Sequence, residues 1–515
     1  MSNTARLDSI DSAKNRSIIP TLFFLSAAVT SVAPLVTWLF LPLIAIALSL
    51  PILRRPNGWR QLIEPNPALI AFLLVALYVL LSTTWAADPG AAFGKATEFL
   101  MVVVITFIAN RSVVQLDEHK LRRAAVACAA GIFLGVLFLT FEVMTHFAAT
   151  RLAMNSIPLL KRSARHVHLS QGEVTWIKPS DLKHNAAILT FGLWPGLLAL
   201  RIIASGTRRA ILMGLFFLGV VTAVVLSDHR SSLVAVCVSL LVFFLAWNWR
   251  KPVIRALAVL YCLTFALVIP VDFTAYNANL QTAEWLPSSF RQRLIIWEYT
   301  AERVLEHPWL GIGAASTPAL REPPDQAEKP QGYPRNTGRH AHDMFLQTWY
   351  ELGAVGAILI ALAGAVVIFR ISLLPIETQP FAAAFFSAFM SIAAFAWGMW
   401  QTWLMFAVGL SVVYLRTATS AAQPQEAMPQ SAYDDLSKTP APDMRAARHK
   451  GGQIKSDLSA LQWMAPASPD TRLLSCSTNV ESAYANDEAG FTRCFQAGLG
   501  RLCSENIVAR LRPSY

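Results

Sequence analysis

Arginine and histidine side chains gather in one polar stretch of the chain, residues 272–343, which lies between long apolar runs. Among them, Arg291, Arg293, His340 and His342 are the candidates for chemistry. Guanidinium groups bind phosphate oxygens through paired hydrogen bonds, and a neutral imidazole accepts a proton near pH 7. The stretch therefore predicts a site that handles an anionic, lipid-borne substrate at a membrane surface.

The two arginines fall at the predicted start of a helix. Ser289-Phe-Arg-Gln292 is typical of a capping box with Ser289 as the N-cap, and an apolar stripe follows at helical spacing up to His307-Pro308. Cations in the first turn of a helix are unfavourable because of the helix dipole, whereas a bound anion reverses the sign. We expect an anion site at this helix start, with two solvated loop arginines as the alternative.

His340-Ala-His342-Asp343 lies where the polar stretch re-enters an apolar run. A histidine at this position can accept a proton from a substrate. The alternative is an interfacial histidine whose ring binds a backbone carbonyl. A His-x-His metal site is a third interpretation, but two nearby ligands are too few for a typical zinc centre, so no metal is expected.

A further ionisable pair, His229 and Arg230, follows Ser227-Asp228 at the expected outer boundary between two apolar runs. An ionisable residue at such a boundary either extends to the membrane interface or serves a site. Both interpretations stay open for Arg230. Asp228 could equally be a salt-bridge partner.

The elements that must position these residues are membrane-spanning helices. The chain has 515 residues, of which 54% are hydrophobic and 15% charged, and its apolar runs reach the length needed to cross a bilayer. We predict an all-α polytopic membrane protein with about twelve transmembrane helices and a large helical loop before the tenth. The predicted spans are 18–34, 36–53, 66–84, 96–111, 124–147, 185–202, 209–227, 231–248, 253–271, 344–369, 380–398 and 401–416.

Basic residues predict the orientation of these spans. Lys and Arg concentrate in alternate short connections, as at Arg54-Arg55 and Arg250-Lys251, which the positive-inside rule assigns to the cytoplasm. The net charge of +11 therefore reflects topology and does not indicate a nucleic-acid partner. The predicted organisation is a cytoplasmic N-terminus (1–17), nine spans (18–271) with an outer loop (148–184), a large periplasmic catalytic loop (272–343), three spans (344–416) and a largely disordered cytoplasmic tail (417–515).

Several motifs in this order resemble the O-antigen ligase / O-antigen polymerase superfamily of bacterial membrane glycosyltransferases. They are Arg293-xxx-Trp297, His307-Pro-Trp-Leu-Gly-Ile-Gly313, His340-Ala-His342-Asp343 with Phe345-Leu-Gln347, and Glu351-Leu-Gly353-Ala-Val-Gly356. Ser227-Asp-His-Arg230 adds weaker support. The resemblance extends from about residue 18 to 416 and leaves out the tail.

The resemblance implies transfer of a glycan from undecaprenyl diphosphate to an acceptor hydroxyl on the periplasmic face of the inner membrane. The membrane part has no Asp-x-Asp motif of the kind that holds a metal in nucleotide-sugar enzymes, so we expect a reaction without metal or cofactor. The resemblance also implies that Arg230 and Arg293 engage the diphosphate and that His342 is the base. The substrate-binding residues expected beside them are Arg291, His340, Asp343, His229 and Trp297. The family commonly has Asn at position 343, so the acid found here either orients and activates His342 or is simply tolerated.

These motifs do not identify the acceptor. Lipid A–core would make the protein an O-antigen ligase, whereas a growing glycan would make it an O-antigen or exopolysaccharide polymerase, and a protein acceptor an O-oligosaccharyltransferase. A transporter of lipid-linked glycans is a further alternative, but it would place charges along a path through the membrane. Here the predicted spans are nearly free of charge, and the exceptions lie toward span ends.

Overall fold

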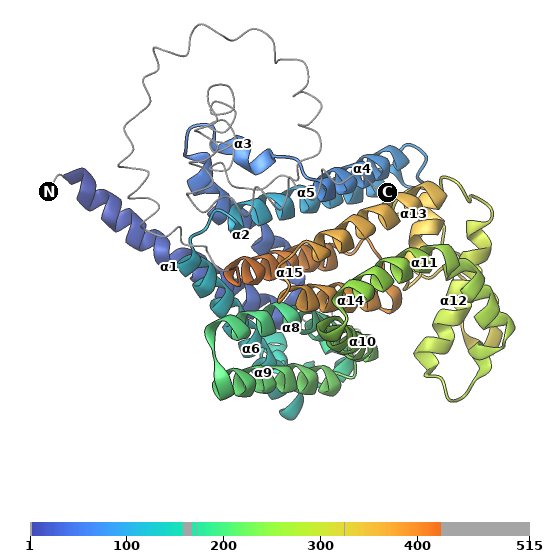
Figure 1. Cartoon of the computed structure of the whole chain (residues 1–515). Coiled ribbons are helices and arrows are strands. Elements are labelled where there is room, and N and C mark those ends of the chain that lie inside the picture. Colours follow the sequence, from blue (N-terminus) through green and yellow to red (C-terminus); the bar gives the residue numbers. More distant parts are fainter. Residues whose placement is uncertain (1–2, 158–166, 171, 324, 424–515) are drawn as a thin grey trace, which may run out of the picture. The chain divides into compact units, whose positions relative to one another are not determined.

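The computed structural model describes residues 3–157, 167–170, 172–323 and 325–423. These ranges are almost entirely helical (Figure 1). The helices are α1 (Asn3–Val32), α2 (Thr37–Leu53), α3 (Gly58–Ile63), α4 (Pro67–Ser82), α5 (Pro89–Val113), α6 (Glu118–Met144), α7 (Ala148–Ser156), α8 (Lys183–Ile203), α9 (Gly206–Leu226), α10 (Arg230–Asn248), α11 (Arg250–Asn277), α12 (Ser288–Val304), α13 (Met344–Ser372), α14 (Gln379–Phe395) and α15 (Thr402–Ala421). The strands β1 (Val167–Ser170) and β2 (Glu173–Ile177) form an antiparallel hairpin that the sequence did not predict.

Nine helices in the described ranges are long and apolar enough to cross a membrane. Three shorter apolar helices, Ile18–Val32 within α1, α4 and α14, accompany them. These twelve correspond to the twelve predicted spans, and the prediction of an all-α polytopic membrane protein is confirmed. The predicted tail lies outside the described residues from position 424 onward.

Several helices are longer than the apolar segments from which they were predicted, because polar side chains cap their N-termini. Asp88 accepts a hydrogen bond from the backbone N–H of Ala91 (3.0 Å), so α5 begins at Pro89 and not near residue 96. Asp117 caps α6 in the same way through the N–H of Lys120 (2.8 Å). Each cap satisfies a backbone donor that the helix itself leaves unpaired, so helix ends extend past the hydrophobic segment.

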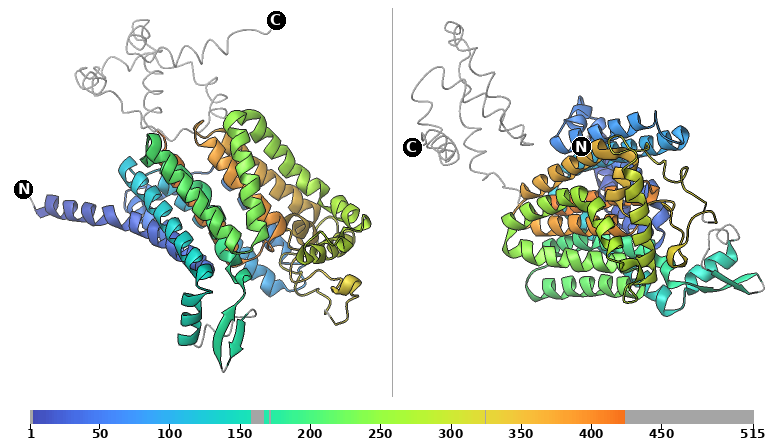
Figure 2. Two further views of the ribbon diagram at one scale, coloured as in Figure 1. Left: turned by 90° about the horizontal axis from the view of Figure 1, so that it is seen from below. Right: turned by 90° about the vertical axis from the view of Figure 1, so that its right-hand side faces the viewer.

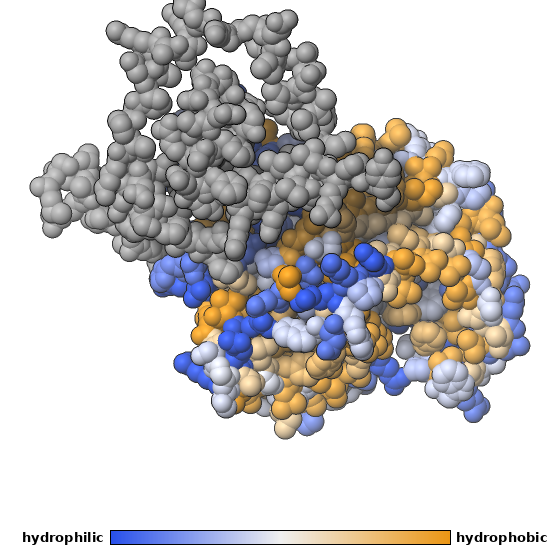
Figure 3. All heavy atoms as spheres, viewed as in Figure 1, coloured by the Kyte–Doolittle hydropathy of each residue, from blue (hydrophilic) through white to orange (hydrophobic). Residues whose placement is uncertain are grey.

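Helix α8 lies at the centre of the packing, in contact with α6, α9, α14 and α15. Its Trp194 is buried and stacks on Phe243 of α10 with the ring centroids 4.8 Å apart. Small residues allow close approach elsewhere: a Cβ at Gly131 of α6 would lie 2.5 Å from the carbonyl oxygen of Phe24 in α1. Hydrophobic side chains also cover much of the outer face of the described part, as a lipid-facing surface requires (Figure 3).

The segments that carry the chemistry meet at one end of these helices. Successive spans alternate in direction. Helices α8, α10, α13 and α15 therefore start at this end, and α9, α11 and α14 end there. Both views in Figure 2 show α7 with the β-hairpin (teal) and residues 305–343 (yellow) at this end. The connections at the opposite end carry the Lys and Arg clusters at positions 54–60, 120–123 and 250–255.

Candidate active site

A cavity of about 250 Å³ lies where these helix ends meet. Its walls come from the start of α8, the turn between α9 and α10, α12, the segment before α13 and the link between α14 and α15. The lining residues are Lys183, His184, His229, Arg293, His340, His342, Ala396, Trp397 and Gln401. None of them is acidic, so the lining combines two cations with four imidazoles.

The ring of His342 is held in a defined orientation. Its Nδ1 lies 2.9 Å from the carbonyl oxygen of Ala396, and a carbonyl oxygen only accepts, so Nδ1 carries the proton and Nε2 keeps its lone pair. The backbone of His342 has φ +58°, a left-handed conformation uncommon for a side-chain-bearing residue. Burial lowers the pKa of His342 to about 4, with a smaller contribution in the same direction from Arg293 and Lys183. The imidazole is therefore neutral at pH 7.

His340 packs against His342, with the ring centroids 4.1 Å apart. Its Nδ1 faces the backbone N–H of His342 (3.3 Å), and its Nε2 faces the amide nitrogen of Gln401 (3.4 Å). The side-chain oxygen of Gln401 is already occupied by the indole N–H of Trp403 (2.8 Å). Both ring nitrogens of His340 thus face donors, which disfavours the imidazolium form, and burial lowers the pKa of His340 to about 3.

The two cations of the lining, Arg293 in α12 and Lys183 at the start of α8, have no acidic partner among the described residues. Burial lowers the pKa of Arg293, although an arginine keeps its charge at neutral pH. Both cations lower the pKa of His342 and His340 through their charge. A partly buried pair of positive charges without a counter-ion is unfavourable, so the cavity is suited to an anion.

Aromatic rings form one wall of the cavity. Trp397 stacks on His184 with the ring centroids 5.4 Å apart and lies 5.0 Å from the ring of His229. Trp403 stands edge-on to both His184 (4.7 Å) and Trp397 (4.8 Å). His229 shares a hydrogen bond with Ser232 (Nδ1 to Oγ, 2.7 Å), and burial lowers its pKa to about 3. This wall offers flat, uncharged surfaces beside the cationic side.

Trp297 and Asp343 lie outside the cavity lining, and their side chains form hydrogen bonds with the backbone on either side of His342. The buried indole of Trp297 donates to the carbonyl of Ala341 (2.8 Å), between the two histidines. The carboxylate of Asp343 caps α13 by accepting from the N–H groups of Phe345 (2.7 Å) and Leu346 (3.1 Å). Asp343 therefore does not orient His342, because the Ala396 carbonyl has that role. Burial raises the pKa of Asp343 to about 7.

The predicted capping box at the start of α12 is wrong. The helix begins at Ser288 with Pro287 as the N-cap, and no side chain caps it. The carbonyl of Pro287 accepts from the N–H groups of Phe290 (2.9 Å) and Arg291 (3.0 Å), so the helix starts two residues earlier than a Ser289 cap would place it. Counting from Ser288, Arg293 is the sixth residue, beyond the first turn in which it was predicted.

Two predicted site arginines lie outside the cavity lining. Arg230 is exposed at the first position of α10, while its neighbour His229 lines the cavity. Arg291 is half-buried, and its Nε has no hydrogen-bond partner among the described residues. Sequence reasoning missed Lys183, whose position before a span, next to His184, repeats the His229-Arg230 pattern and could have indicated it.

The motif His307–Gly313 packs against a break in α13. The helix is interrupted at Gly353 (φ +63°, ψ −166°), and the backbone of the motif forms hydrogen bonds with α13 on both sides of this residue. The N–H of Ala354 donates to the carbonyl of Pro308 (2.8 Å), and the N–H of Gly313 donates to the carbonyl of Glu351 (2.9 Å). The loop thus replaces hydrogen bonds that the kinked helix cannot make with itself.

The carboxylate of Glu351 is buried beside this kink and accepts five hydrogen bonds. The donors are the N–H groups of Ala315 and Thr317, the Thr317 hydroxyl, the Gln347 amide and the Trp400 indole. Gln347 in turn accepts from the N–H of Met399 (3.2 Å). The carboxylate therefore ties the 308–317 loop to the 396–401 link that forms a wall of the cavity.

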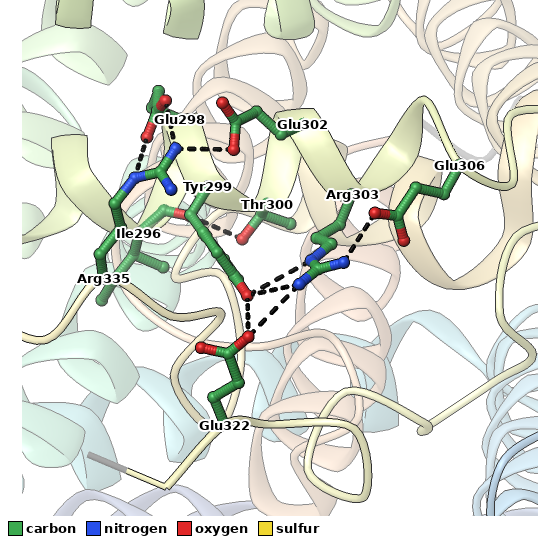
Figure 4. A network of polar contacts seen from close by, with 9 residues as sticks. All are labelled: Ile296, Glu298, Tyr299, Thr300, Glu302, Arg303, Glu306, Glu322 and Arg335. Carbon is green, nitrogen blue, oxygen red and sulfur yellow. Dashed lines mark hydrogen bonds and ion pairs between the residues drawn. The ribbon is translucent and has the colours of Figure 1, made fainter. Parts of the chain in front are cut away.

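A surface network attaches the remainder of the long loop to α12 (Figure 4). Arg335 pairs with Glu298 (2.8 Å) and Glu302 (2.6 Å). Glu322 binds the Tyr299 hydroxyl (2.7 Å) and Arg303 (3.3 Å). Both attachments lie on α12, which also carries Arg293, so they brace the helix that presents a cavity cation.

Comparisons with known proteins indicate what the chain is similar to. Residues 214–361 match the family model described as O-antigen ligase. A protein of Rickettsia conorii provisionally named polysaccharide ligase is 23% identical over 317 residues, which cover 60% of this chain and 69% of the relative. A similarly named protein of Rickettsia felis is 23% identical over 341 residues, covering 64% of this chain and 75% of the relative. The matched segment includes Arg293, His340 and His342, and the findings support the resemblance to the O-antigen ligase superfamily.

Proposed function

We propose that this protein is a membrane glycosyltransferase of the O-antigen ligase type. In this proposal it moves a glycan from undecaprenyl diphosphate to a hydroxyl of lipid A–core. The observation that supports it most strongly is the cavity that holds both Arg293, which has no acidic partner in the part of the chain that the structure describes, and the neutral imidazole of His342. A cation for the leaving diphosphate and a base for the acceptor are the two groups that such a transfer needs.

Arg293 stabilises the departing diphosphate in this scheme. As the bond between the anomeric carbon and the diphosphate oxygen breaks, its electron pair stays on that oxygen. A guanidinium can donate two parallel hydrogen bonds to phosphate oxygens, and its partly buried position strengthens the attraction compared with water. Charge that develops only during the reaction is thereby stabilised more than the ground state. A general acid is not required, because diphosphate leaves as a stable anion.

His342 takes the acceptor proton through Nε2. The acceptor oxygen attacks the anomeric carbon from the face opposite the diphosphate, so the configuration inverts, and the proton passes to the imidazole. The bound diphosphate also makes His342 a better base. Because the charges of Arg293 and Lys183 help to lower the pKa of His342, an anion that offsets those charges raises the pKa again.

The cavity opens, in this proposal, on the periplasmic side of the inner membrane. The short connections at the opposite helix ends carry the Lys and Arg clusters, and such clusters mark the cytoplasmic side. Arg230, exposed beside His229, is proposed to contact the lipid carrier outside the cavity, where a long basic side chain reaches the headgroup region. The flat wall around Trp397 is available to pack against the transferred sugar.

Gel analysis of lipopolysaccharide from a deletion strain complemented with variants tests the proposal. His342→Ala should abolish capped lipopolysaccharide while undecaprenyl-linked polymer accumulates. His119→Ala, an exposed histidine at the opposite end of the helices, serves as the matched control and should restore the wild-type ladder. Chains shortened to one repeat unit would indicate a polymerase instead, and an unchanged ladder with His342→Ala would refute the proposed base.

A further inference from the structure

Lys183 occupies a position that the stability of the helix does not explain. It is the first residue of α8, and none of the described residues forms an ion pair or side-chain hydrogen bond with its ammonium group. A cation at a helix N-terminus opposes the helix dipole. It also shares the cavity with a second cation, Arg293. Both features are unfavourable in the empty protein and become favourable once an anion is bound.

The backbone that carries Lys183 is firmly fixed. Two residues later, the buried amide of Asn185 donates to the carbonyl oxygens of Ser31 (2.8 Å) and Val32 (2.9 Å) at the end of α1. Helix α8 is buried in the helical core from Asn185 to Ala199. A side chain on such a support is preorganised, so less entropy is lost when it binds a ligand.

Lys183 and Arg293 line the same cavity from different helices. His229, His340 and His342 line it with them, and the charges of both cations lower the pKa of all three histidines. Arg230, in contrast, is exposed and does not line the cavity. The cation best placed to complete a two-point anion site with Arg293 is therefore on α8 and not on α10.

We propose that Lys183 is the second cation of the diphosphate site, so that the two phosphoryl groups lie between Lys183 on α8 and Arg293 on α12. This inference rests on the proposed function, since it specifies which residues bind the donor. The chemistry it names is a diphosphate anion, whether carried by the lipid or free.

Binding and kinetics with the full-length protein in lipid nanodiscs test this inference. The probes are inorganic pyrophosphate, inorganic phosphate and undecaprenyl diphosphate, and the variants are Lys183→Met, Lys183→Arg and Arg293→Met. Lys178→Met is the matched control, because it removes an exposed positive charge five residues earlier that is outside the cavity lining. Thermal melting of every variant establishes that it is folded.

Lys183→Met should weaken pyrophosphate binding and raise the KM for the lipid-linked donor by about tenfold to a hundredfold, as the loss of a charge-assisted hydrogen bond implies. Lys183→Arg should restore most of the affinity, phosphate should bind more weakly than pyrophosphate, and Lys178→Met should match wild type. If undecaprenyl diphosphate binds and pyrophosphate does not, the lipid is the source of the recognised group. Wild-type affinity in Lys183→Met, together with lost affinity in Arg293→Met, overturns the role of Lys183 alone. Undiminished affinity in both variants overturns the proposed function as well. Should Lys183→Met not fold, Lys183→Gln takes its place in the same comparison.

Discussion

Replacing Glu351 should destabilise the protein and disturb the cavity, although Glu351 does not line the cavity. The carboxylate accepts five hydrogen bonds from four residues. Ala315 and Thr317 belong to the 308–317 loop, Trp400 to the 396–401 link and Gln347 to α13 itself. Glu351→Ala removes the acceptor for all five donors at once. Because the site is fully buried, water cannot replace the carboxylate without a rearrangement of the helices around it.

The magnitude follows from the donors left without partners. A buried donor without an acceptor costs about 1–3 kcal/mol, but the Thr317 hydroxyl and the Gln347 amide can turn toward other acceptors. The two backbone N–H groups and the Trp400 indole cannot. Counting these three donors, and allowing for partial relaxation, we expect Glu351→Ala to lower the free energy of unfolding by about 4–6 kcal/mol. Glu351→Gln keeps one oxygen and should lose about 2–4 kcal/mol.

Thermal unfolding of the full-length variants in nanodiscs measures these losses, and donor turnover is measured on the folded fraction. Glu284→Ala is the control, because Glu284 is exposed and should change stability by less than about 0.5 kcal/mol. Glu351→Gln should also lower kcat, since the link that carries Ala396, the hydrogen-bond partner of His342, loses its anchor. A melting temperature of Glu351→Ala equal to that of wild type would refute this reasoning.

Three further outcomes are expected. Since burial lowers the pKa of His342 to about 4 from 6.5, the unfolded chain takes up its proton first as the pH falls. Stability should therefore drop between pH 6.5 and about 4, and His342→Gln should flatten that drop in a series of melts. Gly353→Ala should cost about 3 kcal/mol or more, because φ is positive there and a Cβ would lie 2.4 Å from the backbone of the facing loop. Gly214→Ala, where a Cβ meets nothing within 4 Å, should melt like wild type. Arg335→Ala leaves the buried Glu298 without its ion-pair partner. We expect the free energy of unfolding to fall by about 2 kcal/mol and hydrogen exchange in the long loop to become faster. Unchanged exchange would contradict the role given to this network.

The spans could be predicted from the sequence because their cause is local. A run of about 20 apolar residues has to bury its backbone polar groups within its own helix once it enters a bilayer. The orientation of the spans stays a prediction, which rests on the charge bias of each short connection. Helix starts were predicted less well. At α12 the sequence predicted Ser289 as the cap, whereas the helix begins after Pro287 without a side-chain cap.

The candidate site was predicted only in part. The order of Arg293, His340 and His342 is visible in the chain, and the resemblance that their motifs indicated is supported by the matching family model. The sequence alone determined which residue types could do chemistry and that they lie beside a membrane. Only the packing of helices far apart in the chain decided that Lys183 joins them and that Arg230 does not line the cavity. The same packing made the Ala396 carbonyl, and not Asp343, the partner of His342. Such contacts depend on which helix ends meet in space, and no local pattern of residues encodes that.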